Sequence, residues 1–167
     1  MVTTGVAPEA VRRPVPANVQ VRAFVPFAEL LPRVSVAVTN GGFGSVQAAL
    51  AHGVPLVVAG TSEDKRDIAA RVAWSGAGIR LPDRSPSPAA LRGAVHDVLD
   101  GPRYRRQAEA FRREIAATDA PRRAAALVEA LAATGRPVIT APSPAPSPAP
   151  SPALDAVAAV DAPDRQR

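Results

Sequence analysis

The middle third of the chain shows a strand–helix–strand pattern of apolar residues. Residues 34–38 and 54–58 are short runs dense in β-branched side chains, which is typical of buried strands in a parallel sheet. Between them, residues 45–51 have the small-residue composition of a helix, and His52 with Gly53 ends it in the manner of a glycine C-cap. The pattern predicts a βαβ unit around which the rest of the chain is organised.

Shorter patterns continue on both sides of this unit. Ile68 and Val72 lie four residues apart, as on one face of an amphipathic helix, and Ser87 before Pro88 is a preferred helix start. The alternation of strands and helices predicts an α/β fold with a Rossmann-like, doubly wound parallel sheet and additional C-terminal helices. The other expected elements are strands at residues 2–5, 18–24 and 78–81, a helical turn at 27–31, and helices at 64–75, 87–101, 104–117 and 121–133.

A glycine-rich turn follows the first strand of the βαβ unit. Asn40 is followed by Gly41, Gly42 and Gly44, and Ser45 opens the expected helix. Glycine allows a ligand to approach the backbone closely, and a helix that starts after a parallel strand directs its free N–H groups at the same edge. The turn therefore predicts an anion site, typically for phosphate; the alternative is a tight turn without a ligand.

Composition narrows the function classes. The chain lacks cysteine, which excludes disulfides and thiol catalysis and fits a reducing, cytoplasmic location. It contains neither an apolar run of membrane-spanning length nor a signal-peptide pattern at its start. The net charge is +5, and all basic residues except Lys65 are arginines. These arginines are not interleaved with aromatic residues, so we expect a solvated basic face and no nucleic-acid partner.

The spacing of residues from the glycine-rich turn to Gly78 resembles the donor-binding motif of nucleotide-sugar-dependent glycosyltransferases with the GT-B fold. Within that group, the sequence is most similar to the bacterial antibiotic and macrolide type. The resemblance implies an incomplete C-terminal domain of that fold, which binds a UDP- or TDP-sugar as donor substrate and needs neither a cofactor nor a metal. The matching positions are residues 39–42, Ser45, 49–50, 53–55, 63–65, 69–72 and 74–78.

The resemblance also implies roles for individual residues. Asn40, Gly41, Gly42, Gly44 and Ser45 correspond to the positions that bind the donor diphosphate. Asn40 stands where the family usually has a histidine, and an amide donates a hydrogen bond without carrying charge.

Two positions further along correspond to the residues that bind the donor sugar. These are Asp64 and Lys65, and Lys65 replaces the usual glutamine. The alternative for this pair is a helix start with an acidic cap and an exposed lysine.

Recognition of the nucleoside is the weakest part of the match. Phe27 stands where many members have a glutamine near the nucleoside, and Ala48 replaces a glutamate that binds ribose. Gln47 is adjacent but projects about 100° away on a helix. Phe27 and Gln47 are the candidates, with a core aromatic as the alternative for Phe27. We assign His52 to the structure.

His96 is likewise assigned to the structure, and the sequence predicts no metal site.

The match covers about residues 1–133, and we expect residues 1–136 to form part of a donor-binding domain. Residues 137–167 are rich in Pro, Ala and Ser and predict a disordered tail, either a solvated extension or a ligand for a proline-reading partner.

Three functional hypotheses follow from the resemblance. The first is a fragment of a hexosyltransferase that transfers sugar to a hydroxyl of a small molecule, with its catalytic base and acceptor site in a domain outside this chain. The second is a non-catalytic donor-binding subunit that needs a separate acceptor-domain chain, and the third is an inactive remnant. An incomplete sheet also exposes an edge, so self-association is expected.

Overall fold

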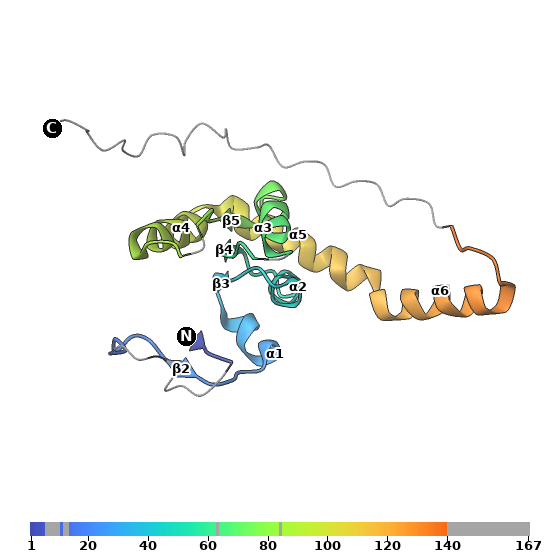
Figure 1. The fold of residues 1–167 in the computed structure, drawn as a ribbon, viewed down its shortest axis with the longest axis horizontal. Helices are drawn as coiled ribbons and strands as arrows, with labels where there is room; N and C mark the ends of the chain where they lie inside the picture. Colours follow the sequence, from blue (N-terminus) through green and yellow to red (C-terminus); the bar gives the residue numbers. More distant parts are fainter. Residues whose placement is uncertain (6–10, 12–13, 63, 84, 140–167) are drawn as a thin grey trace.

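The computed structural model describes residues 1–5, 11, 14–62, 64–83 and 85–139. Its described strands form two parallel sheets (Figure 1). In the smaller sheet β1 (Val2–Thr3) pairs with β2 (Val21–Arg22), and in the larger sheet β4 (Leu56–Val58) lies between β3 (Ala37–Thr39) and β5 (Gly78–Arg80). Glu63 and the predicted tail from residue 140 lie outside the described residues.

Helices alternate with these strands, which confirms the predicted α/β fold. One helix or more follows each of the strands β2 to β5, as expected for parallel strands joined by crossover connections. The helices are α1 (Phe27–Leu30) with a short 3-10 helix η2 (Leu31–Arg33), α2 (Phe43–Ala51), α3 (Lys65–Trp74), α4 (Pro88–Asp100), α5 (Pro102–Thr118) and α6 (Ala120–Thr134).

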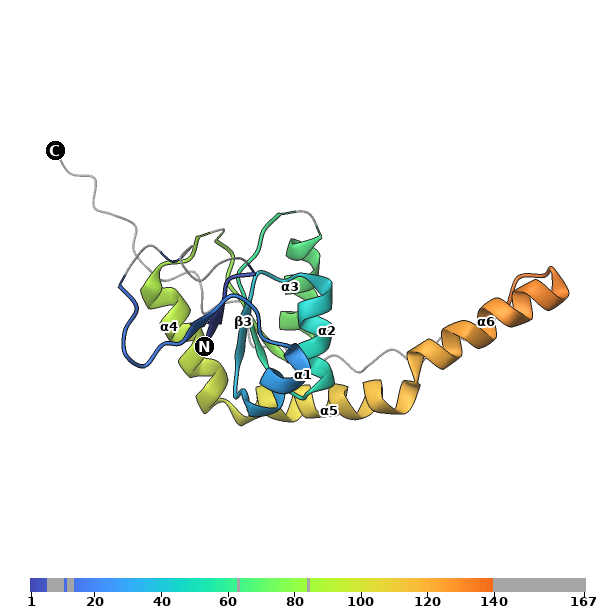
Figure 2. The ribbon, with the colours of Figure 1, turned by 90° about the horizontal axis from the view of Figure 1, so that it is seen from below.

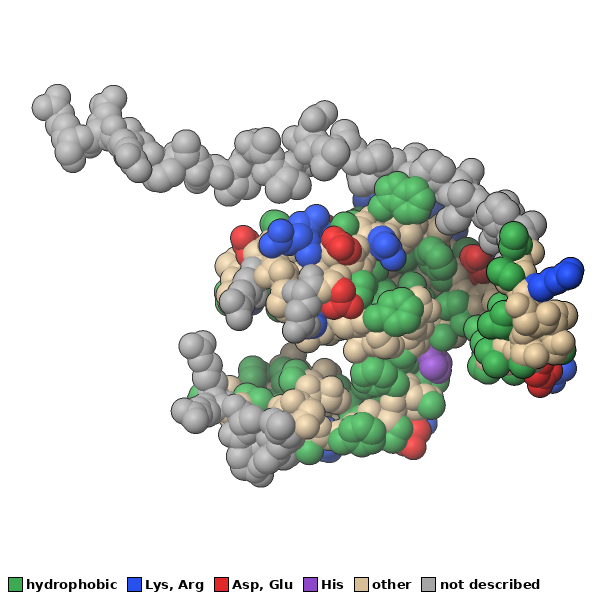
Figure 3. Space-filling model, turned by 45° about the vertical axis from the view of Figure 1, so that its right-hand side comes forward, with side chains coloured by type: hydrophobic (Ala, Val, Ile, Leu, Met, Phe, Trp, Pro, Cys, Tyr) green, Lys and Arg blue, Asp and Glu red, His purple; other side chains and the backbone are tan. Residues whose placement is uncertain are grey.

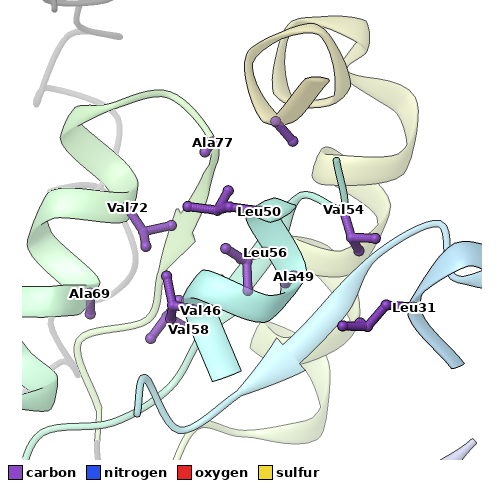
Figure 4. Close-up of a cluster of buried hydrophobic side chains, with 11 residues drawn as sticks. Leu31, Val46, Ala49, Leu50, Val54, Leu56, Val58, Ala69, Val72 and Ala77 are labelled. Carbon is purple, nitrogen blue, oxygen red and sulfur yellow. The ribbon is translucent and has the colours of Figure 1, made fainter. Parts of the chain in front are cut away.

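The larger sheet is covered on both faces, as the doubly wound arrangement requires (Figure 2). Leu56 and Val58 face one layer, where they pack with side chains of α2, α3 and α5 (Figure 4). Val57 points the opposite way and packs against α4. Each of these three strand residues is 0% exposed. Burial of one such side chain contributes about 1.5–3 kcal/mol, so β4 is the centre of the core.

The ends of several elements differ from the prediction because local turns compete with strand pairing. Val34 was expected to begin a strand, but its N–H donates to the carbonyl of Leu31 at 3.1 Å, so β3 starts three residues later. The strand expected at residues 18–24 is reduced to β2, since the Val19 N–H donates to the carbonyl of Pro16 at 2.9 Å. Local hydrogen bonds therefore shorten both predicted strands.

Helix starts follow capping rules. Ser87 caps α4 as predicted, and its hydroxyl oxygen accepts a hydrogen bond from the Ala90 N–H at 3.1 Å. α5 begins two residues before its predicted start, because Pro102 occupies the first helical position, which suits its fixed φ angle. No described helix has the length and apolar character needed to cross a membrane.

The last helix differs from the others in its packing. α6 has no buried residue, and it extends away from the sheet (Figures 1 and 2). Val128 and Leu131 on this helix are 67% and 49% exposed. In the described part of the chain, α6 therefore presents an apolar stripe that the rest of the fold leaves uncovered.

Candidate functional site

The glycine turn lies at the carboxyl end of β3, where the chain leaves the sheet and enters α2. Gly41 is buried and has a φ of +87°, a conformation that glycine adopts without strain. A Cβ atom at Gly41 would lie 2.8 Å from Cγ1 of Val58 and 3.3 Å from the backbone oxygen of Lys65. The turn therefore packs directly on the end of β4 and on the first residue of α3.

Hydrogen bonds within the turn fix its shape. The Gly41 N–H donates to Oγ1 of Thr39 at 3.3 Å, and the Gly42 N–H donates to Oδ1 of Asn40 at 3.2 Å. Asn40 is exposed, and this bond directs its side-chain oxygen inward. The amide NH₂ of Asn40 is the part of the side chain that can donate to a ligand.

The start of α2 completes this edge of the site. Gly42 is the N-cap residue with φ −60° and ψ 135°, and no side chain caps the helix there. The first N–H groups of a helix have no carbonyl partner within it, and they carry the positive end of the helix dipole. The backbone N–H groups from Phe43 to Ser45 can therefore bind an anion, and Ser45 adds a hydroxyl in the first turn.

The start of α3 lies against the same turn. Asp64 is its exposed N-cap residue, and its side chain makes no capping hydrogen bond. Lys65 is half-buried, and its Nζ donates to Oγ of Ser62 at 3.4 Å. The structure thus brings Lys65 beside Gly41, although 23 positions separate them in the sequence. A site at this edge combines two helix starts with one ammonium group and one carboxylate.

The sequence analysis missed Gly60, which belongs to the same edge. A Cβ atom at this position would overlap the backbone carbonyl of Asn40, so the chain leaving β4 passes directly over the turn. The signal available in the sequence was a glycine placed two residues after a buried strand, where close backbone approach is a common reason for glycine.

The other predicted site residues are less closely tied to the turn. Phe27 begins α1, is 42% exposed, and belongs to neither buried cluster, so the alternative of a core aromatic was wrong. Gln47 is exposed on α2. His52 is the C-cap residue of α2 with Nδ1 2.8 Å from the carbonyl oxygen of Ala48, which supports its structural assignment. His96 is exposed on α4.

Comparisons with known proteins show which family the chain is similar to. Residues 3–131 match the family described as "Erythromycin biosynthesis protein CIII-like, C-terminal domain". The chain is 53% identical over 129 residues to 4'-demethylrebeccamycin synthase of Lentzea aerocolonigenes, covering 77% of this chain and 30% of that protein. It is 44% identical over 119 residues to UDP-glycosyltransferase 2 of Phaeomoniella chlamydospora, covering 71% of this chain and 26% of that protein.

Solved structures show the same fold. The calicheamicin glycosyltransferase CalG4 superposes with a TM-score of 0.70 at 32% identity, over 80% of this chain and 35% of that one. The glycosyltransferase VinC, solved in complex with DTDP, gives a TM-score of 0.60 at 29% identity, over 65% of this chain and 28% of that one.

The match to the family extends over most of the chain, whereas the chain spans only 30% and 26% of the length of the two curated relatives. Fold, motif spacing and sequence identity all point to the same group of proteins. This chain belongs to the erythromycin biosynthesis protein CIII-like C-terminal domain family of GT-B, nucleotide-sugar-dependent glycosyltransferases.

Proposed function

We propose that residues 1–136 form the donor-binding part of a hexosyltransferase, with a UDP- or TDP-sugar as donor substrate. The observation that carries this proposal is the contact between Gly41 and Lys65, which joins the starts of α2 and α3 at one edge of the sheet. Ligands of open α/β folds bind at the carboxyl ends of the strands. DTDP in the related VinC structure is consistent with a nucleoside diphosphate as ligand.

In this proposal the turn holds the donor diphosphate. Asn40 donates through its side-chain NH₂, Ser45 through its hydroxyl and Gly44 through its backbone N–H. Gly41 and Gly42, whose N–H groups bond to Thr39 and Asn40, let the diphosphate approach the backbone of the turn. Transfer breaks the bond between the sugar C1 atom and the phosphate oxygen while the acceptor hydroxyl oxygen bonds to C1. Negative charge then builds up on the departing diphosphate, where fixed N–H groups and the dipole of α2 stabilise it.

The start of α3 is proposed to bind the sugar. The Asp64 carboxylate accepts hydrogen bonds from sugar hydroxyls, and the Lys65 ammonium donates to a hydroxyl or to the diphosphate. Phe27 and Gln47 are proposed to contact the nucleoside. The base that deprotonates the acceptor hydroxyl is assigned to no residue of this chain, so transfer would require the acceptor domain of a longer or assembled enzyme.

A second candidate is a donor-binding subunit that works with a separate acceptor-domain chain. The uncovered apolar stripe of α6 favours it, because Val128 and Leu131 would be buried against such a partner. The same stripe would serve for self-association. The assignment of residues 137–167 to a segment outside the donor domain stays a prediction, as does a cytoplasmic location.

The test is a calorimetric titration of the purified chain with UDP, TDP and UDP-glucose. We expect saturable binding that Asn40→Ala weakens for all three ligands and Asp64→Ala weakens only for UDP-glucose. Asp97→Ala is the matched control, because Asp97 is an exposed carboxylate on α4, away from the turn. Absence of binding by a chain whose circular dichroism shows it to be folded would refute the donor site and leave an inactive remnant.

A further inference from the structure

Two positions of the candidate site differ in charge from the residues that the family resemblance implies, and the fold brings them together. Asn40 is an uncharged amide where a histidine is usual, and Lys65 is an ammonium where a glutamine is usual. A Cβ atom at Gly41, the residue after Asn40, would lie 3.6 Å from Cβ of Lys65 and 3.3 Å from its backbone oxygen. The uncharged amide and the ammonium therefore belong to segments that touch.

The glycine turn has a limited capacity to neutralise an anion. Oδ1 of Asn40 accepts the Gly42 N–H at 3.2 Å, so the NH₂ group is the part of this side chain left to donate. An amide is a neutral donor, and hydrogen bonds from charged donors are roughly twice as strong. The Gly41 N–H is also engaged, since it donates to Oγ1 of Thr39 at 3.3 Å. The side chain of Asn40 thus offers a diphosphate a hydrogen bond without positive charge.

Lys65 is placed where it can add that charge. It is the first residue of α3 and is half-buried against the turn. Its Nζ atom donates to Oγ of Ser62 at 3.4 Å, which is long for a hydrogen bond, so a stronger acceptor can take the place of Ser62. The lysine stem is flexible, and Gly41 has no side chain that would separate this stem from the backbone of the turn. Rotation of the stem therefore brings the ammonium to an anion held by the turn.

The other described charges at the start of α3 are more accessible to water. Asp64, Arg66 and Asp67 are exposed, whereas Lys65 is half-buried, and a partly buried charge is screened less by solvent and salt. On the face drawn in Figure 3, blue and red side chains are interspersed, so the described residues shown there form no large area of one sign. Attraction of an anion to this edge of the sheet therefore depends on Lys65 and on the starts of α2 and α3.

We propose that Lys65 supplies the positive charge for the donor diphosphate, in place of a charged side chain at position 40. This inference rests on the proposed function, and it decides between the two roles named there for the Lys65 ammonium. The amide of Asn40 and the N–H groups of α2 then hold the diphosphate from one side, and Lys65 holds it from the other. When the bond between the sugar C1 atom and the phosphate oxygen breaks, the ammonium offsets the negative charge left on the diphosphate.

The two roles of the ammonium predict different losses when it is removed. A cation that contacts the diphosphate contributes to the binding of UDP, which has no sugar, as well as to that of UDP-glucose. A cation that contacts sugar hydroxyls contributes to the binding of UDP-glucose alone. The comparison of these two ligands therefore separates the roles.

The test is calorimetric titration of Lys65→Gln with UDP and with UDP-glucose, after circular dichroism has shown the variant to be folded. We expect the affinity for both ligands to fall about tenfold, as for the loss of one hydrogen bond from a charged group. Arg66→Gln is the matched control, because it removes the same charge from the next residue, which is exposed. It should change the affinity for UDP by less than about twofold, since solvent and salt screen its charge. Lys65→Arg keeps the charge and should retain most of the affinity.

A double variant moves the charge to the other side of the contact. Asn40→His combined with Lys65→Gln places an ionisable side chain at position 40 and removes the ammonium at position 65. Histidine is protonated below its ordinary pKa of about 6.5. At about pH 5.5 the double variant should bind UDP at least about fivefold more tightly than Lys65→Gln does at the same pH, and this gain should disappear by about pH 8.

Unchanged UDP affinity in Lys65→Gln, or a loss confined to UDP-glucose, would overturn the proposal. Equal losses in Lys65→Gln and Arg66→Gln would overturn it too, because net charge would then explain both. A double variant that gains nothing at the lower pH would refute the link to position 40. All of these results leave the donor site intact, since the unaltered chain still binds UDP. Failure of the unaltered chain to bind UDP would instead refute the donor site and this inference together.

Discussion

Replacement of Gly41 by alanine is the most direct test of the candidate site's geometry. Gly41 has a φ of +87°, where an L-residue is strained by about 1–2 kcal/mol. The added Cβ would also lie 2.8 Å from Cγ1 of Val58, on a strand that is completely buried. Overpacking of this kind adds about 1–3 kcal/mol. Together they predict that Gly41→Ala lowers the free energy of unfolding by about 2–5 kcal/mol.

Gly44→Ala is the matched control, because it makes the same chemical change three residues further along the same segment. A Cβ at Gly44 meets nothing within 4 Å, and the residue lies inside α2. Alanine is favoured over glycine in a helix by up to about 1 kcal/mol. We therefore expect Gly44→Ala to be neutral or stabilising. Urea denaturation followed by circular dichroism gives the free energy of unfolding for both variants.

Equal stability of the two variants would refute the reasoning. It would mean either that Gly41 does not have a positive φ or that the turn does not pack on Val58 and Lys65. A Gly41→Ala protein that is destabilised but folded should also bind UDP more weakly, since the turn has to move away from β4. Titration of the variant with UDP is done without urea, at a temperature where circular dichroism shows the variant to be folded. Weaker binding under these conditions is then separate from unfolding.

Three further variants test other parts of the fold. Ser87→Ala removes the N-cap hydrogen bond to Ala90 and should lower the free energy of unfolding by about 1 kcal/mol in urea denaturation. Gly53→Ala should lower the melting temperature in calorimetry, because Gly53 has a φ of +68° and its Cβ would approach the Glu109 carboxylate. The hydrogen bond from Arg112 holds the pKa of Glu109 below its ordinary value, so its contribution to stability is lost as the pH falls through the folded pKa. Glu109→Gln should therefore flatten the acid side of the stability–pH profile below about pH 4.3, with Glu114→Gln as control.

The order of strands and helices could be predicted because the local pattern of apolar residues indicates which segments are buried. The apolar run around Val57 has only one good placement, the centre of a sheet covered on both faces. The ends of strands could not be predicted equally well. Val34 is as apolar as Val38, and only the hydrogen bond to Leu31 keeps it out of β3. Such a bond depends on how the preceding turn folds, which hydrophobic periodicity does not encode.

The composition of the candidate site could be predicted, but its internal contacts could not. Glycines after a strand indicate close backbone approach, yet they do not say which segment approaches. Lys65 reaches Gly41, and Gly60 reaches Asn40, only because β3 and β4 are neighbours in register. The burial of a single side chain could not be predicted either, since Phe27 stands in an apolar stretch of the sequence and is 42% exposed. Which residues of the site lie in contact depends on how the strands pair in the folded sheet.

The uncapped start of α2 leads to a last prediction, in which stability and binding change in opposite directions. Gly42 has the φ and ψ of an N-cap residue, and a Cβ there would meet only Oδ1 of Asn40, at an ordinary 3.6 Å. Gly42→Ser therefore fits without strain, and its hydroxyl can accept from the first N–H groups of the helix. A serine cap in place of glycine stabilises by a few tenths of a kcal/mol. The same N–H groups are those proposed to hold the diphosphate, so the variant should bind UDP more weakly while resisting urea slightly better. Unchanged UDP affinity in a more stable variant would contradict the role of these N–H groups in binding.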